Sequence, residues 1–259
     1  MKELNRCTAG YLKKVFWTNL LVCISFVAFS QQKNMYINHD YSDQVTRYIL
    51  RDVKQGNEQY VHNASLPMLE SDYQKLDRIW EDTIPQYFKV TDFIFRKSWI
   101  EIHKKRFNLY VDPVLNMSVG SDLTKDTLLN NFRNTRGFLI RGDIGDKFSF
   151  ETSFYENQAR YLDYQSAYFK SNGELYYNSN NGKYFRQNAV VNGMGRTKPF
   201  KTDGLDHAFA TGYVSYKPIK QLNLQFGYGA HFIGNGYRSL LLSDNSFKYP
   251  YLKINSNFW

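Results

Sequence analysis

Hydrophobic and polar residues alternate strictly in two neighbouring runs, residues 206–217 and 221–232. Because successive side chains of a strand point to opposite faces, each run predicts a strand with one apolar and one polar face. Each run is about ten residues long, close to the 9–11 residues that a tilted strand needs to cross a bilayer. The connection between them, Lys217–Lys220, is short, as the turns on one side of outer-membrane barrels are. The pattern therefore predicts part of a transmembrane β-barrel wall.

The same two-residue period occurs elsewhere in the chain. Residues 108–120 carry apolar side chains on one parity, although Pro113 cannot donate a ladder hydrogen bond and predicts a bulge or a break. Residues 138–144 and 148–154 alternate on either side of a Gly-Asp turn, which predicts a hairpin. A last strand is predicted to begin at residue 251, with Leu252, Ile254, Ser256 and Phe258 on one parity.

Two segments do not alternate. Residues 41–106 carry apolar residues at helical spacing, and Ser42 or Asp43 is placed to cap a first helix. We therefore expect a small α-helical module at residues 31–106. Residues 158–204 are rich in Tyr, Asn, Ser and Gly and predict a long extracellular loop with a short hairpin near Glu174–Phe185. The segment from Phe232 to Lys248 is expected either to fold inward or to lie outside the cell.

The N-terminus has the features of an export signal. Lys13 and Lys14 precede the apolar core Val15–Phe29, and cleavage is predicted after Ser30, so that residues 1–30 form a signal peptide. A membrane anchor is the alternative, but its core is shorter than the roughly 20 residues of a spanning helix. Both cysteines of the chain lie in this segment, so the exported chain has no disulfide and no thiolate metal site.

Charge and aromatic content fit an exported membrane protein. The net charge is +9, and four of the 33 basic residues and one of the 24 acidic residues lie in the signal peptide. A basic surface suits anionic lipid or acidic polysaccharide, and export argues against nucleic acid as a partner. The chain contains 21 Tyr and 20 Phe, and the interfacial girdles of a barrel would use such an aromatic excess.

Three segments carry a resemblance to a known family. They are GYGAHFIGNGYRSLLLSDNSFKYPYLKINSNFW at Gly227–Trp259, Thr135–Gln158 and Gly193–Gly212. They resemble the outer-membrane family of capsule-assembly (Wzi-like) barrels and gliding-motility surface proteins of Bacteroidetes-type bacteria. The resemblance implies a location in the cell outer membrane and a helical module that is periplasmic or plugs the barrel. The partners it implies are outer-membrane lipid, surface or capsular polysaccharide, and motility or secretion components.

The strand count sets the expected architecture. The alternation predicts about six spanning strands, or seven if residues 108–120 cross twice, whereas bacterial barrels use even numbers from about eight upward. A spanning sheet cannot leave an edge open in lipid. We therefore predict a mainly β fold, an antiparallel transmembrane β-barrel that is incomplete, with residues 107–259 as its N-terminal part. A soluble β-sandwich is the structural alternative.

The motifs of common enzymes are missing from the sequence, which has no phosphate loop, no metal-spaced His/Cys cluster and no GxSxG elbow. We therefore predict a non-enzymatic protein without cofactor, metal or catalytic residues, and expect a role in polysaccharide assembly or attachment, or in gliding motility. His207 and His231 could meet in the lumen, as plain polar residues or as the base of a lipase-like hydrolase. A passive pore is a further alternative.

Candidate glycan-binding residues come from two polar clusters. The first contains Asn235, Tyr237, Arg238 and Asp244, whose amide, phenol and charged groups suit sugar recognition. Its structural alternative is that these groups satisfy charges in the lumen. The second cluster is the basic patch with Arg196 and Lys198 in the long loop. This patch suits acidic glycan or phosphate, or is simply solvated.

Overall fold

The computed structural model describes residues 33–35, 37, 47, 54, 65–70, 97–121, 131–234, 236 and 238–256. The predicted signal peptide lies outside these residues, as does most of the predicted helical module. Arg47 and Lys54, which fall in the first predicted helix, are helical. The last strand is described only as far as Ser256.

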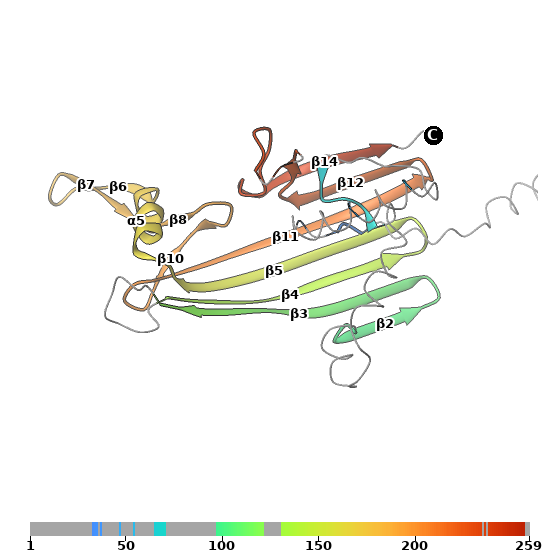
Figure 1. Ribbon diagram of the computed structural model, residues 1–259, viewed down its shortest axis with the longest axis horizontal. Coiled ribbons are helices and arrows are strands. Elements are labelled where there is room, and N and C mark those ends of the chain that lie inside the picture. The colour runs from blue at the N-terminus through green and yellow to red at the C-terminus, as the bar shows by residue number, and fades with distance from the viewer. Residues whose placement is uncertain are drawn as a thin grey trace, which may run out of the picture. The chain divides into compact units, whose positions relative to one another are not determined.

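One eight-stranded antiparallel sheet dominates the described chain. Figure 1 shows its long strands side by side, in the order β14-β12-β11-β5-β4-β3-β2, while β10 pairs with one end of β11. The bounds are β2 Ile100–Lys104, β3 Phe107–Gly120, β4 Asn131–Ile144, β5 Phe148–Arg160, β10 Lys198–Phe200, β11 Gly204–Ile219, β12 Leu222–Gly229 and β14 Tyr249–Ser256. The predicted mainly β, antiparallel fold is confirmed, including the hairpin of β4 and β5.

The sheet of the described residues is open, with β2 and β14 at its edges, and no closed barrel forms in this part of the chain. Residues 108–120 form one strand and do not cross twice. Strand β2 was not expected, because it lies in the range 31–106 assigned to the helical module. Its five residues, IEIHK, are too few for the alternation to stand out. No helix in the described ranges is long and apolar enough to span a membrane.

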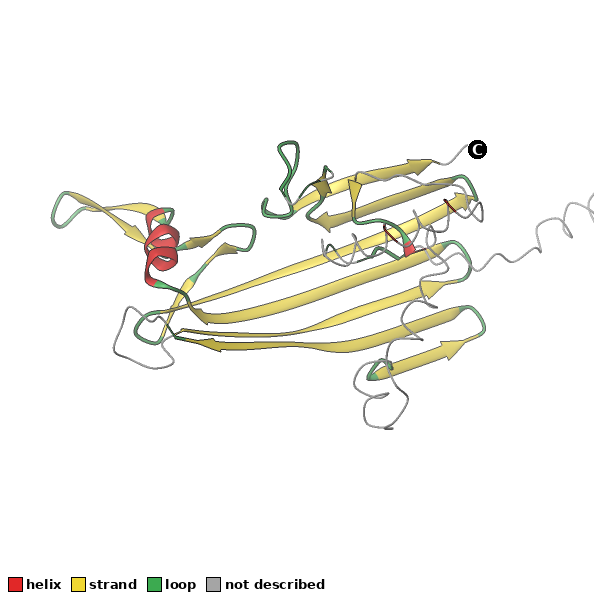
Figure 2. Cartoon of the chain, viewed as in Figure 1, coloured by secondary structure: helices red, strands yellow, loops and turns green. Residues whose placement is uncertain are grey.

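The residues between β5 and β11, which we call the excursion, contain regular structure of their own. Their elements are α5 Asp163–Ser171, β6 Glu174–Asn178, β7 Lys183–Gln187, β8 Val190–Val191 and β9 Gly195–Arg196. The predicted short hairpin is confirmed as β6 and β7. Figure 2 shows the helix α5 beyond the end of the long strands. This helix was missed because it buries none of its residues and has no continuous apolar face.

The two faces of the sheet have the reverse of the exposure expected for a protein folded in water. Phe226 is 66% exposed, whereas its neighbour Gln225 is fully buried. The other exposed apolar side chains include Leu115, Met117, Phe138, Ile144, Phe148, Phe154, Val214, Leu252 and Ile254, and the buried polar ones include Ser149, Ser153, Asn157, Ser215 and Asn223. A soluble antiparallel sheet packs its apolar face on the core. We call the apolar side the outer face and the polar side the inner face.

On β5 the apolar outer face forms a belt of limited height, whereas on β3 exposed apolar side chains continue through Leu115, Met117 and Val119 to the end of the strand. Along β5 the belt runs from Phe148, which stacks on Tyr216 at 4.5 Å between ring centroids, to Phe154, which stacks on Phe138. The six steps from Phe148 to Phe154 along β5 span roughly 20 Å at the usual strand rise, near the 25 Å apolar band of outer-membrane barrels. The next outer-face row is polar on β4 and β5, where Arg136 and Glu156 form an exposed ion pair.

The positions of the bulge and of one turn differ from the predictions. The prediction of a bulge or a break at Pro113 is wrong, because β3 and β4 stay in register through the pair Pro113–Phe138. Strand β2 pairs with β3 only as far as Val111. On the β2 side of β3, the described structure therefore has no strand opposite Pro113, and its missing N–H breaks no ladder hydrogen bond there. The register shift occurs instead in β11, between Tyr216 and Ile219. The predicted turn Lys217–Lys220 is therefore strand up to Ile219, and a bulge accommodates Pro218.

Two short segments, residues 33–35 and 65–70, lie together on the inner face, and we call them the strap. They are joined by a bridge between Asn34 and Leu69 and by the hydrogen bond from Met35 N to Met68 O at 2.7 Å. Strand β1 (Ser65–Leu66) of the strap pairs with β13 (Phe232–Ile233), which leaves the sheet after β12. The second predicted run therefore ends as a sheet strand at Gly229, and not at Phe232.

A glycine on the inner face makes room for the ring that anchors the strap. A Cβ atom at Gly227 would lie 2.6 Å from both Tyr213 Cβ and Gly212 O. We therefore expect Gly227→Ala to lower the free energy of unfolding by about 1–3 kcal/mol, as overpacking does. Denaturant unfolding in detergent micelles measures this change. Gly120→Ala is the control, because a Cβ there meets no atom within 4 Å, and equal losses would contradict the packing argument.

Candidate functional site

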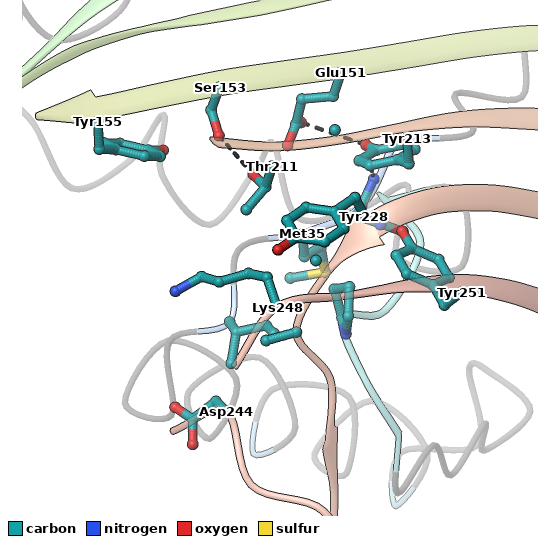
Figure 3. Close-up of a pocket in the computed structure, with 16 residues that line it drawn as sticks. Met35, Glu151, Ser153, Tyr155, Thr211, Tyr213, Tyr228, Asp244, Lys248 and Tyr251 are labelled. Atoms are coloured by element: carbon teal, nitrogen blue, oxygen red, sulfur yellow. Dashed lines mark hydrogen bonds between the residues drawn. The ribbon is translucent and has the colours of Figure 1, made fainter. Parts of the chain in front are cut away.

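A cavity of about 290 Å³ lies where the strap meets the inner face of the sheet. Its lining comes from the strap, from β5, β11, β12 and β14, and from the segment before β14 (Figure 3). The volume is at the lower end of the range for small-molecule sites. Because strap residues Asn34, Met35 and Pro67 form part of its wall, the cavity depends on the docking of the strap.

Carboxylate and hydroxyl groups gather on one side of the cavity. The Asn34 backbone N–H donates to Tyr213 Oη at 2.7 Å, and Tyr213 Oη in turn donates to Glu151 Oε2 at 3.4 Å. The hydroxyls of Ser153 and Thr211 lie 2.6 Å apart. Figure 3 shows these four side chains together on adjacent strands β5 and β11. Such a group offers both donors and acceptors to a polyhydroxylated ligand.

A buried amide pair fixes the strap beside the cavity. Asn34 Nδ2 donates to Gln225 Oε1 at 3.1 Å, and Gln225 Nε2 donates to Asn34 Oδ1 at 3.0 Å. The Tyr251 hydroxyl donates to the same Gln225 oxygen at 3.2 Å. The pairing satisfies the buried amide of Gln225 at both ends, which burial makes necessary. It joins residues 191 positions apart in the sequence and so sets the position of the strap on the sheet.

A buried ion pair holds the strap at Lys33, the residue before Asn34. Lys33 Nζ lies 2.9 Å from Asp143 Oδ2, with 6% and 16% of the two side chains exposed. The Ser149 hydroxyl donates to Asp143 at 2.7 Å, and the Lys33 ammonium lies 4.8 Å from the ring centre of Tyr110. Asp143 and Tyr110, the two partners of Lys33, and Ser149, which supports Asp143, all belong to the inner face. A polar sheet face thus serves as the docking surface of the strap.

Lys248 links the cavity to the excursion. Its ammonium donates to the Gly193 carbonyl and lies 4.1 Å from the ring centre of Phe209. Burial lowers the pKa of Lys248. The ring of Phe209 in turn stacks on that of Tyr155, at 4.9 Å between centroids, and Tyr155 lines the cavity. The wall near Lys248 is therefore aromatic, in contrast to the hydroxyl-rich wall at Glu151.

The predicted glycan-binding residues fall in different places. Among the described candidates only Asp244 lines the cavity. Arg196 pairs with Glu174 in the excursion, Lys198 is exposed on β10, and Arg238 is exposed after β13. Asn235 and Tyr237 lie outside the described residues. The polar cluster in the sequence therefore pointed to one residue of the cavity.

Sequence reasoning missed the strand residues of the cavity, Glu151, Tyr155, Tyr213 and Tyr251. Each occupies the polar parity of its strand and faces inward. Large aromatic residues on a parity that otherwise holds Ser, Asn and Gln are the signal that was available. A ring there needs a concave or covered surface, because a polar strand face in water would not select for it.

The two histidines have different neighbours. His231 Nδ1 lies 3.1 Å from Tyr249 Oη, and burial lowers the pKa of His231 to about 4. His207 is buried on β11, where its ring packs against Tyr161 at 6.5 Å. In the described structure neither ring bonds to a serine hydroxyl. Nor do His, Cys, Asp and Glu side chains group there in a way that could hold a metal ion.

No protein-family model, curated protein or solved structure matches this chain. The function is therefore argued from the sheet and its cavity.

Proposed function

We propose that this chain forms part of the wall of an outer-membrane β-barrel and acts non-enzymatically in organising surface polysaccharide, with a sugar unit held in the cavity. The observation that carries the membrane part is the inverted sheet, apolar and exposed outside, polar and buried inside. In water, an exposed apolar area that covers several strands marks an interaction surface. Lipid is the partner whose thickness suits the height of the belt.

The soluble β-sandwich is the weaker alternative because of what covers the sheet. A sandwich buries apolar side chains between two sheets. Here the covered face carries Ser149, Ser215 and Gln225, and the strap that covers it combines Lys33 and Asn34 with the buried apolar side chains Met35, Leu66, Met68 and Leu69. Burial of polar groups with matched hydrogen bonds, while apolar groups stay outside, is the arrangement of a barrel wall with a filled interior.

The chemistry of the cavity supports a sugar as its ligand. Strand β5 supplies the Glu151 carboxyl group, the Ser153 hydroxyl and the Tyr155 ring, and β11 adds the Thr211 hydroxyl. The Tyr155 ring stacks on Phe209, and the Lys248 ammonium lies over the Phe209 ring. Hydroxyl and carboxylate groups match the hydroxyls of a sugar, and tyrosine rings offer an apolar body with a polar end. The assignment to polysaccharide also draws on the family resemblance, and a role in motility would have the resemblance as its sole support.

A binding measurement with one matched pair of variants tests the cavity. Polysaccharide extracted from the surface of the producing cells is titrated against the full chain in detergent micelles. We expect Glu151→Gln to weaken binding about tenfold, the cost of about one lost hydrogen bond. Glu156→Gln is the control on the same strand, since Glu156 lies on the outer face and pairs with Arg136.

Two outcomes would count against the proposal. If a carbonate wash releases the full chain from membranes of the producing cells, the sheet is not a membrane wall. If Glu151→Gln and Glu156→Gln bind equally well, the cavity does not hold the sugar. The wash and the titration thus examine the two parts of the proposal separately.

A further inference from the structure

The hairpin of β6 and β7, residues 174–187, carries exposed aromatic rings on both of its faces. Tyr177 and Tyr184 are paired across the strands with ring centroids 5.1 Å apart, and Tyr176 and Phe185 are paired on the other face at 6.0 Å. All four side chains are exposed. We call this element the aromatic hairpin. Figure 1 shows it past the end of β5 and β11.

These rings do not build the core of the excursion. That core consists of Ala189, Val191 and Leu205, against which Tyr161, Phe169 and Met194 pack. The hairpin rings are absent from it, and two tyrosines of α5, Tyr164 and Tyr168, are exposed as well. Exposed rings gathered on one small element outside the sheet indicate a binding surface.

Along β5, a polar stretch separates the aromatic hairpin from the belt. The belt ends on β5 at Phe154, and the excursion begins after Arg160, a further six residues along the strand. At the usual strand rise this is roughly 20 Å. Over that distance the outer face of β4 and β5 turns polar, with the Arg136–Glu156 ion pair. On β3, by contrast, exposed apolar side chains continue through Leu115 and Met117 to Val119, which is level with Arg160. Binding of the hairpin to lipid is therefore an outcome that the experiment must distinguish.

The charge around the hairpin favours an acidic partner. Residues 158–204 contain seven Lys and Arg against three Asp and Glu. Lys170, Lys183 and Lys198 are exposed, and the Glu174 carboxylate is already paired with Arg196. The hairpin tip reads Asn-Ser-Asn-Asn-Gly at residues 178–182. Tyrosine combined with Asn, Ser and Gly is also the composition of antibody binding loops, where rigid rings give contact area and small polar groups give hydrogen bonds.

We propose that the aromatic hairpin is a docking surface for an acidic polysaccharide. The rings of Tyr177 and Tyr184 stack on the apolar faces of successive sugars, and Lys183 pairs with a carboxylate of the polymer. This inference rests on the proposed function, to which it adds a second contact outside the cavity and the charge of the polymer. A protein partner is less well matched, because the rings are interleaved with charged and amide side chains and do not form a continuous apolar patch.

The test uses the full chain in detergent micelles and two polymers, alginate as a polyuronate and dextran as a neutral glycan. We expect alginate to bind, dextran to bind at least tenfold more weakly, and the alginate affinity to fall when salt rises from 50 to 200 mM. The double variant Tyr177→Ala/Tyr184→Ala is expected to lose at least tenfold in alginate affinity. Tyr177→Phe/Tyr184→Phe keeps the rings and is expected to stay within about threefold of the unaltered protein.

A second pair of variants tests the charge. Lys183→Glu is expected to weaken alginate binding about tenfold, whereas Lys147→Glu, in the turn at the other end of β5, is expected to leave it unchanged. Lys147 is exposed like Lys183, so the pair differs in place and not in accessibility. Equal effects of the two variants would overturn the proposal, because binding would then follow net charge alone.

Three further results would overturn the inference. They are equal affinity for alginate and dextran, full alginate binding by Tyr177→Ala/Tyr184→Ala, and binding of the hairpin to phosphatidylglycerol vesicles in place of alginate. None of these results contradicts the proposed function if the chain still resists the carbonate wash and Glu151→Gln still weakens binding of the extracted polysaccharide. Failure of those two readouts would instead remove the proposed function.

Discussion

Replacing Leu252 by lysine is expected to destabilise the membrane-inserted protein by about 2–4 kcal/mol, the cost of a cationic side chain near the middle of the lipid-facing band of a barrel. Leu252 lies on the outer face of β14, in one cross-strand row with Phe226 and Val214. This row is inside the belt and not at its margin. Unfolding by denaturant in lipid vesicles measures the change, and the carbonate-resistant fraction of the variant is expected to fall with it.

The chain offers a matched control for this experiment. Leu175 on β6 is 58% exposed, close to the 68% of Leu252, and lies in the excursion outside the belt. If both leucines face water, Leu175→Lys and Leu252→Lys are both nearly neutral, as surface substitutions usually are. If the belt faces lipid, Leu252→Lys alone is costly. Two small effects would therefore contradict a membrane location of the outer face.

The two-residue period was sufficient to predict the long strands. It located β3, β11, β12 and β14 with their two faces, but it predicted only residues 138–144 of β4 (Asn131–Ile144) and 148–154 of β5 (Phe148–Arg160). This succeeded because each strand has one face that needs apolar residues and one that needs polar ones, so the pattern repeats over many residues. Strand β2 has five residues and α5 has no buried face, so neither had a repeating signal to detect.

Local chemistry alone could not locate the bulge. Pro113 and Pro218 both lack the N–H that a ladder needs. Whether this costs a hydrogen bond depends on the strand on each side, and β2 ends before it reaches Pro113. Pro218 has β12 as a neighbour on one side only, since the pairing of β11 with β5 ends at Tyr216–Phe148, and the register with β12 shifts between Tyr216 and Ile219. At Pro113 the outcome depends on the length of β2, which the residues near the proline do not encode.

The candidate site was hidden for a related reason. The cavity combines strap residues such as Asn34 with strand residues such as Gln225 and Glu151, which lie far apart in the sequence. A polar cluster that is continuous in the sequence, such as residues 235–245, is easy to notice. Of the predicted site residues that the structure describes, only Asp244 lines the cavity. A site made by covering one face of a sheet is instead indicated by unusual residues on that face, here inward tyrosines.

The strap can be detached by removing one charge. Lys33→Ala leaves the Asp143 carboxylate buried without its cation, and breaking a buried ion pair in this way costs about 3–5 kcal/mol. We expect this loss in the free energy of unfolding in detergent micelles, together with faster proteolysis within residues 31–70 as the strap leaves the sheet. Because strap residues line the cavity, binding of the extracted polysaccharide is expected to weaken in the same variant.

The exposed pair Arg136–Glu156 provides the comparison that isolates burial. Its N–O distance of 2.8 Å is nearly the same as the 2.9 Å of Lys33–Asp143, but its side chains are 49% and 38% exposed, against 6% and 16%. Arg136→Ala is therefore expected to cost less than about 1 kcal/mol. The double variant Lys33→Met/Asp143→Asn, which removes both charges, is expected to recover most of the loss, since neutral replacement of a buried pair is often tolerated. Equal costs for Lys33→Ala and Arg136→Ala would show that Lys33 is solvated and that the strap does not lie on the inner face in solution.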